Sequence, residues 1–222
     1  SWGDCGVALP LLPRTPLAAL HVEWIGLTNL VEILAENPEE LYDTIKVMRR
    51  AEDELYRLVC AAPYPFVVIP DNLSAETMYS LWNTFSRDYY VEKIGELHAS
   101  GKKVACHIDG TLGRLLKSLI ETGVDFPEAV TPAPVGDLSL EVIREAVGPE
   151  TVVWGRVPGA MFAPPFTKEE VLGHVRRVLD VLGKEMRLVL AGAVRFLPMG
   201  ILSLCGKLES LSRNTGQNAD QS

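Results

Sequence analysis

The sequence predicts an α/β fold of the (β/α)8 TIM-barrel type, incomplete at its N-terminus. From about residue 66 onward, short apolar runs alternate with longer amphipathic stretches, which is the pattern of parallel strands joined by helices. The chain has 222 residues, of which 47% are hydrophobic and 23% charged, so it is long enough to bury one substantial core.

Five segments are predicted to form strands, because each is short, apolar and rich in residues that favour β-structure. They are residues 66–69, 103–108, 128–130, 152–154 and 187–191. Residues 17–23 are a further strand candidate, which brings the total to about six.

Helices are predicted at residues 38–61, 87–98, 111–121, 138–147 and 168–182. Thr167 and Glu170 match a capping box at the start of the last of these. Asp137 is the expected N-cap of the helix at 138–147. His98 and His174 fall within helices, and we expect both at the surface.

A closed barrel of this type needs eight strands and typically about 250 residues. This chain offers about six strands and begins with Ser1 rather than Met, so we expect a missing N-terminal portion. The alternative is an open, doubly wound parallel sheet.

Composition narrows the class of protein. No apolar run approaches the roughly 20 residues of a membrane span, and residues 1–20 lack the features of a secretory signal. The four cysteines form no C-x-x-C pair, and the net charge of -8 comes without a basic cluster for nucleic acid. We therefore expect a cytoplasmic protein with reduced thiols, which acts on a small molecule.

The strongest candidate site lies at the end of the strand predicted at 103–108. His107 and Asp109 are two residues apart, so their side chains are expected on the same side, facing the barrel mouth. Glu128, in the next predicted strand, is a candidate base or ligand for the same pocket. An imidazole and a carboxylate can share a zinc ion, so His107 and Asp109 are also tentative metal ligands. The alternatives are pocket chemistry without a metal and a purely structural role. Cys106 is expected to point the opposite way, as a buried thiol.

Four residues at other strand ends are candidate substrate-binding residues. Asp71 and Asn72 follow the strand predicted at 66–69, although Asp-Asn is also a common turn pair. The indole of Trp154 can stack on a flat substrate, and Gly155 permits close approach, although a core tryptophan is the competing interpretation. Glu23 is a weaker candidate.

Several segments, in order, resemble the C-terminal half of the uroporphyrinogen decarboxylase superfamily, which includes corrinoid-dependent methyltransferases and is similar to cobalamin-independent methionine synthase. The segments are 101–110 (GKKVACHIDG), 115–123, 131–137 (TPAPVGD), 138–148, 153–155 (VWG) and 167–171. The likeness covers roughly residues 60–193.

The resemblance implies a barrel whose active site lies at the C-terminal ends of its strands. It implies a methyltransferase that acts between a corrinoid or other small methyl carrier and an acceptor, with a corrinoid protein as a partner. Zinc methyltransferases of the superfamily carry a His-x-Cys pair that activates a thiol substrate; here Asp109 stands in place of the cysteine, and no cysteine lies near Ala193.

The resemblance leaves two alternatives open. One is uroporphyrinogen III decarboxylase of porphyrin biosynthesis, which needs no cofactor and binds its tetrapyrrole through an arginine-rich N-terminal motif. That motif is not visible in this sequence. The other is a non-catalytic or degenerate binding protein.

The end of the chain departs from the resemblance. Relatives continue after the position of Ala193 with a segment similar to Val-Pro-Pro-Asp-Gly-Asp, whereas this chain reads VRFLPMGI over residues 194–201. A shift of reading frame near Ala193 reconciles the two. We therefore expect residues 1–193 to form the barrel domain and residues 194–222 to be a frameshifted or disordered tail.

Overall fold

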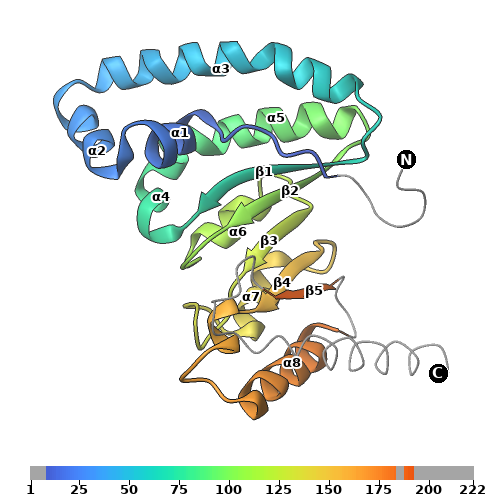
Figure 1. The fold of residues 1–222 in the computed structure, drawn as a ribbon. Helices are drawn as coiled ribbons and strands as arrows, with labels where there is room; N and C mark the ends of the chain where they lie inside the picture. The colour runs from blue at the N-terminus through green and yellow to red at the C-terminus, as the bar shows by residue number, and fades with distance from the viewer. Residues whose placement is uncertain (1–8, 184–187, 193–222) are drawn as a thin grey trace.

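The computed structural model describes residues 9–183 and 188–192. Five strands form one parallel sheet in the order β1-β2-β3-β4-β5 (Figure 1). They are β1 (Phe66–Leu73), β2 (Lys103–Ile108), β3 (Phe126–Val130), β4 (Val153–Val157) and β5 (Leu188–Gly192).

The predicted parallel α/β class is confirmed, but the sheet is open, and the described residues do not close it into a barrel. Each strand pairs in parallel with the next strand along the chain, and the order does not reverse within the described residues. A doubly wound sheet contains such a reversal, and the five described strands do not show one. The tail expected at 194–222 lies outside the described residues.

The sheet continues by one short stretch beyond β1. Leu12 N–H donates to the carbonyl of Val68 over 2.9 Å, and Val68 N–H donates to the carbonyl of Pro10 over 3.0 Å. Residues 10–12 therefore run parallel to β1 at its outer edge.

Helices connect and cover the strands. The α-helices are α1 (Pro16–Ala19), α2 (Gly26–Glu36), α3 (Pro38–Ala61), α4 (Ala75–Leu81), α5 (Arg87–Ala99), α6 (Leu115–Ile120), α7 (Leu140–Val147) and α8 (Lys168–Leu182). Two short π-helices, η2 (Leu20–Trp24) and η3 (Trp82–Ser86), and one 3-10 helix, η4 (Gly159–Phe162), complete the described elements. The structure finds α2 and α4 where the sequence reading predicted no helix.

Three sequence predictions are corrected. Residues 17–23 are helical rather than a strand, because Pro16 starts α1 with a favourable φ and the apolar side chains pack inward from a helix. The N-cap of α7 is Ser139, whose hydroxyl accepts the N–H of Val142, and not Asp137. His174 is buried rather than at the surface, because it lies on the inward face of α8.

One face of the sheet packs against helices. α5 lies on β2 and α8 on β4, while α3 lies outside α5 (Figure 1). Val104, Cys106 and Ile108 of β2 enter the core on this face. His107 alternates with them, so it projects from the other face.

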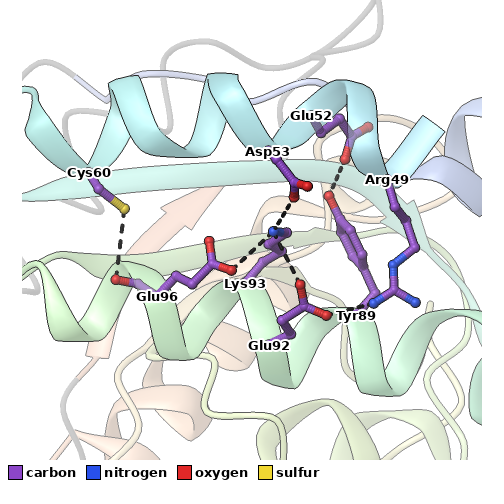
Figure 2. Close-up of polar contacts among 8 residues, drawn as sticks. All are labelled: Arg49, Glu52, Asp53, Cys60, Tyr89, Glu92, Lys93 and Glu96. Atoms are coloured by element: carbon purple, nitrogen blue, oxygen red, sulfur yellow. Dashed lines mark hydrogen bonds and ion pairs between the residues drawn. The ribbon is translucent and has the colours of Figure 1, made fainter. Parts of the chain in front are cut away.

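An ion-pair cluster joins α3 to α5. The side chain of Lys93 on α5 is only 3% exposed, and its Nζ lies 2.8 Å from Asp53 of α3. Glu92 and Glu96 of α5 contact the same Nζ at 3.2 and 3.0 Å (Figure 2). A buried ammonium is stable only when it is paired, so this cluster fixes how the two helices pack.

Beside this cluster, the Tyr89 hydroxyl donates a hydrogen bond to the Glu52 carboxylate (Figure 2). Burial raises the pKa of Glu52 to about 7, although this hydrogen bond acts to lower it. The negative charge of Asp71 adds to the rise. The Glu52 carboxyl, at the contact between α3 and α5, therefore titrates near neutral pH.

No helix in the described part of the chain is both long enough and apolar enough to cross a membrane.

Candidate functional site

The candidate site is a row of side chains across three neighbouring strands. His107 of β2 is in register with Glu128 of β3, and Glu128 is in register with Trp154 of β4. Residues in register on adjacent strands share one face of a sheet. The row, defined as His107, Glu128 and Trp154, therefore lies on the face opposite to Cys106. His107 is near the carboxyl end of β2, whereas Glu128 lies in the middle of β3. Trp154 lies near the start of β4, which runs on to Val157 instead of ending at residue 154 as predicted.

His107 and Glu128 form a direct pair. The Nδ1 atom of His107 is hydrogen-bonded to Oε2 of Glu128, and the two side chains are 22% and 16% exposed. An ionised carboxylate only accepts hydrogen bonds, so with such a partner Nδ1 carries the hydrogen, and the neutral imidazole has its lone pair on Nε2. A carboxylate that orients an imidazole in this way prepares Nε2 to act as a base or as a metal ligand. The sequence placed both residues in the site but did not predict their pairing.

Asp109 does not join this pair. It follows β2 and is exposed, and its backbone N–H donates to the carbonyl of Leu73 over 2.9 Å. Within the described residues, no group of three or more His, Cys, Asp or Glu side chains is placed to hold a metal ion. Zinc binding by His107 and Asp109 stays a prediction.

Asp71 lies within β1, which runs on to Leu73 instead of ending at residue 69, and its side chain enters the helix layer. The buried Asp71 carboxylate accepts the backbone N–H of Thr15 over 2.8 Å and also the Thr15 hydroxyl. The Tyr90 hydroxyl donates to it over 2.6 Å. Burial raises the pKa of Asp71, and these hydrogen bonds oppose the rise. The structure therefore does not bring Asp71 together with His107.

Asn72 lies beside a residue that the sequence reading missed. Its backbone has a φ of 53°, and its side-chain oxygen accepts a hydrogen bond from Nη1 of Arg14 over 3.2 Å. The same Nη1 donates to the carbonyl of Pro70, and Nε of Arg14 lies 3.0 Å from Oε1 of Glu23. Burial lowers the pKa of His21, and the charge of Arg14 lowers it further. Arg14 precedes the first helix in no recognisable motif, so no sequence signal pointed to it.

Cys106 is a buried free thiol, as predicted. Its Sγ atom lies 3.5 Å from the Tyr90 hydroxyl on the helix side of the sheet. Burial raises the pKa of this thiol, so it is held in the neutral form. Cys106 is therefore not prepared to act as a nucleophile.

Gly155 has a structural requirement of its own. Its φ is +120°, and a Cβ atom at this position would lie 3.2 Å from the Cα of Ala129. Ala129 itself has a φ of 63°, at the point where the register between β3 and β4 shifts. Gly155 thus permits the backbone of β3 to approach β4 closely. Contact between Gly155 and a substrate stays a prediction.

Asp137 ties together two loops that follow β2 and β3. Its carboxylate accepts the backbone N–H groups of Leu112 and Gly113, each over 2.8 Å. These amides belong to the loop between β2 and α6, which begins at Asp109. Asp137 therefore fixes the loop that leaves the site, in place of capping α7.

No protein-family model matches the chain, and no curated protein sequence matches it either. Among solved structures, the chain is similar to a methyltransferase from Methanosarcina mazei, with a TM-score of 0.72 and 15% identity over 96% of this chain. It spans 61% of that protein. A putative fructose-1,6-biphosphate aldolase from Coccidioides immitis aligns with a TM-score of 0.37 and 14% identity, over 84% of this chain and 76% of the aldolase. The first likeness shows a shared fold; the second is too weak to support an argument.

Proposed function

We propose that the protein is a methyltransferase, which moves a methyl group between a corrinoid or other small methyl carrier and an acceptor. The observation that carries this proposal is the likeness of fold to the Methanosarcina mazei methyltransferase over 96% of the chain. A likeness at 15% identity extends to the fold alone, so the chemical argument comes from the His107–Glu128 pair. A corrinoid-bearing protein is the partner that this function would need.

The row can supply the proton transfer that methyl transfer to a protonated acceptor requires. As the acceptor's sulfur, oxygen or nitrogen forms its bond to the methyl carbon, the bond from that carbon to the carrier breaks, and its electron pair stays with the carrier. The acceptor must also lose a proton, which Nε2 of His107 can take. Glu128 then stabilises the imidazolium through Nδ1–H, and the partly exposed Trp154 offers a flat apolar surface for the carrier.

The test is methyl transfer from methylcobalamin to a small thiol, followed through the change in corrinoid absorbance. Replacing His107 by glutamine removes the base, so we expect His107→Gln to lower the rate by about 10²- to 10⁴-fold. Glu128→Gln keeps the base but removes the charge that orients it, and a smaller loss, of about 10- to 100-fold, is expected. Both variants should retain the circular-dichroism spectrum of the wild type.

His98→Gln is the matched control. His98 also pairs with a carboxylate, because its Nε2 lies 2.7 Å from Asp125, but that pair lies outside the row. This variant should keep the full rate. Equal losses in His98→Gln and His107→Gln would remove the row from the chemistry. A wild-type protein that transfers no methyl group but decarboxylates uroporphyrinogen III would replace the proposal with the decarboxylase alternative.

A further inference from the structure

We infer that Arg14 forms an anion-binding subsite beside the row, which takes a carboxylate or phosphate group of the substrate. The assignment to a substrate rests on the proposed function. The binding of an anion itself does not.

Strand register places Arg14 at the level of His107. Strand β1 pairs with β2 at Ile69–Cys106 and again at Leu73–Ile108. Between these pairs β2 has a single residue, His107, whereas β1 has three, Pro70 to Asn72. Nη1 of Arg14 bonds the carbonyl of Pro70 and the side chain of Asn72. The guanidinium is therefore attached, from the outer edge of β1, to the stretch of β1 whose other edge faces His107.

Arg14 is held in place by its neighbour in the chain. The N–H and the hydroxyl of Thr15 both bond to Asp71, which is buried and is also bonded to Tyr90. The side chains of Thr15 and Asp71 enter the helix layer. Their neighbours in the chain, Arg14 and Asn72, bond to one another and remain partly exposed. The positive charge is thus presented from a fixed backbone, which lowers the entropic cost of binding a ligand.

The charge of Arg14 is only partly balanced. Its side chain is 17% exposed, and its carboxylate partner Glu23 is 51% exposed, so this ion pair is open to solvent and weak. Nε and Nη1 are engaged by Glu23, Pro70 and Asn72, while Nη2 has no hydrogen-bond partner among the described residues. A guanidinium with free N–H groups binds a carboxylate or phosphate through charge-assisted hydrogen bonds. A substrate that carries such a group would bind Arg14 while its acceptor atom meets His107.

Calorimetric titration of the wild-type protein with acetate and with inorganic phosphate tests the inference and tells the two anions apart. Arg14→Gln removes the charge, so we expect the dissociation constant to rise at least about tenfold. Arg14→Lys keeps the charge but lacks the planar guanidinium. Its dissociation constant should therefore lie between those of the wild type and Arg14→Gln. Glu23→Gln removes the competing carboxylate and leaves the Arg14 contacts to β1 intact, so it should tighten anion binding.

The exposed pair Arg177–Glu141, with 2.9 Å between Nη2 and Oε1, provides matched controls. Arg177→Gln and Glu141→Gln alter the net charge as the test variants do, and they should leave anion affinity unchanged. The opposite effects of Arg14→Gln and Glu23→Gln separate binding from loss of folding, because an unfolded variant cannot bind more tightly.

The inference is overturned if the wild type binds neither anion, or if Arg14→Gln and Glu23→Gln bind it as the wild type does. Methyl transfer is measured separately. Loss of anion binding in Arg14→Gln without any methyl transfer in the wild type would keep the subsite and reject the proposed function. Methyl transfer that depends on His107, together with an anion affinity that Arg14→Gln leaves unchanged, would reject the subsite and keep the proposed function.

Discussion

Asp71 joins three parts of the chain: the segment before α1, strand β1 and helix α5. It does so because one buried carboxylate accepts hydrogen bonds from the Thr15 N–H, the Thr15 hydroxyl and the Tyr90 hydroxyl. A buried donor that loses its acceptor costs its full desolvation energy. The carboxylate therefore stabilises the fold chiefly by satisfying these three donors.

Asp71→Ala should lower the free energy of unfolding by about 2 to 4 kcal/mol, because it leaves these donors buried without a partner. Urea denaturation followed by circular dichroism measures the change. Asp109→Ala is the control, since that carboxylate is exposed, and its effect should stay within about 0.5 kcal/mol. Equal losses in the two variants would show that the Asp71 network contributes nothing.

At the residue scale, the sequence could place His107 and Glu128 at one site, but it predicted neither their pairing nor the separate position of Asp71. Alternation along 103–108 correctly separated His107 from Cys106. Contact between His107 and Glu128 depends on the register between β2 and β3, which is set by packing over the whole sheet. Asp71 was expected in the pocket because it directly follows the strand predicted at 66–69, yet β1 continues through it to Leu73 with an irregular register.

At the scale of elements, the pairing of β3 with β4 depends on a glycine. Gly155→Ala would bring a Cβ atom to 3.2 Å from the Cα of Ala129 and would strain a backbone with φ of +120°. We expect a loss of about 2 kcal/mol or more in the free energy of unfolding.

Gly173→Ala is the opposite control in the same urea experiment. Gly173 is exposed in the middle of α8, and a Cβ there meets nothing within 4 Å. Alanine favours a helix interior over glycine, so this variant should gain about 0.5 to 1 kcal/mol. If both variants shift the free energy of unfolding in the same direction, the close approach of the β3 backbone is not the reason why position 155 requires glycine.

Elements with strong local signals were predicted to the residue. The capping box fixed the start of α8, and α3 and β2 also have the predicted bounds. Residues 17–23 were mistaken for a strand because a short apolar run fits either structure, and only its burial against the sheet and α3 decides for a helix.

At the scale of the whole molecule, Glu52 makes stability depend on pH. In the unfolded chain its pKa is near 4.5, whereas burial raises it to about 7 in the folded protein. Between these values the unfolded chain releases a proton that the folded protein keeps. The contribution of Glu52 to the free energy of unfolding is therefore lost as pH rises from about 4.5 to about 7.

Glu52→Gln should make the urea midpoint fall less between about pH 5 and pH 7.5 than it does in the wild type. Glu54→Gln is the control on the same helix. The hydrogen bond from Arg57 lowers the pKa of Glu54, so the contribution of Glu54 to the free energy of unfolding changes only at lower pH. In Glu54→Gln the urea midpoint should therefore fall with pH as it does in the wild type. A Glu52→Gln slope equal to that of the wild type would contradict the raised pKa.

Alternation of apolar runs and helices predicted the parallel α/β class, and the consecutive strand order fits the barrel-type expectation better than the doubly wound one. Closure could not be predicted from these patterns, because it depends on strand number and tilt rather than on any local signal.

The strand order also bears on how the protein is synthesised. Each strand after β1 pairs with the strand that precedes it in the chain, so the partner of every new strand has already been made when that strand leaves the ribosome. β1, α5 and β2 can assemble before β4 and β5 are translated, and each later unit is added to an existing edge. Assembly can thus proceed in step with translation, from the N-terminal side of the sheet toward β5.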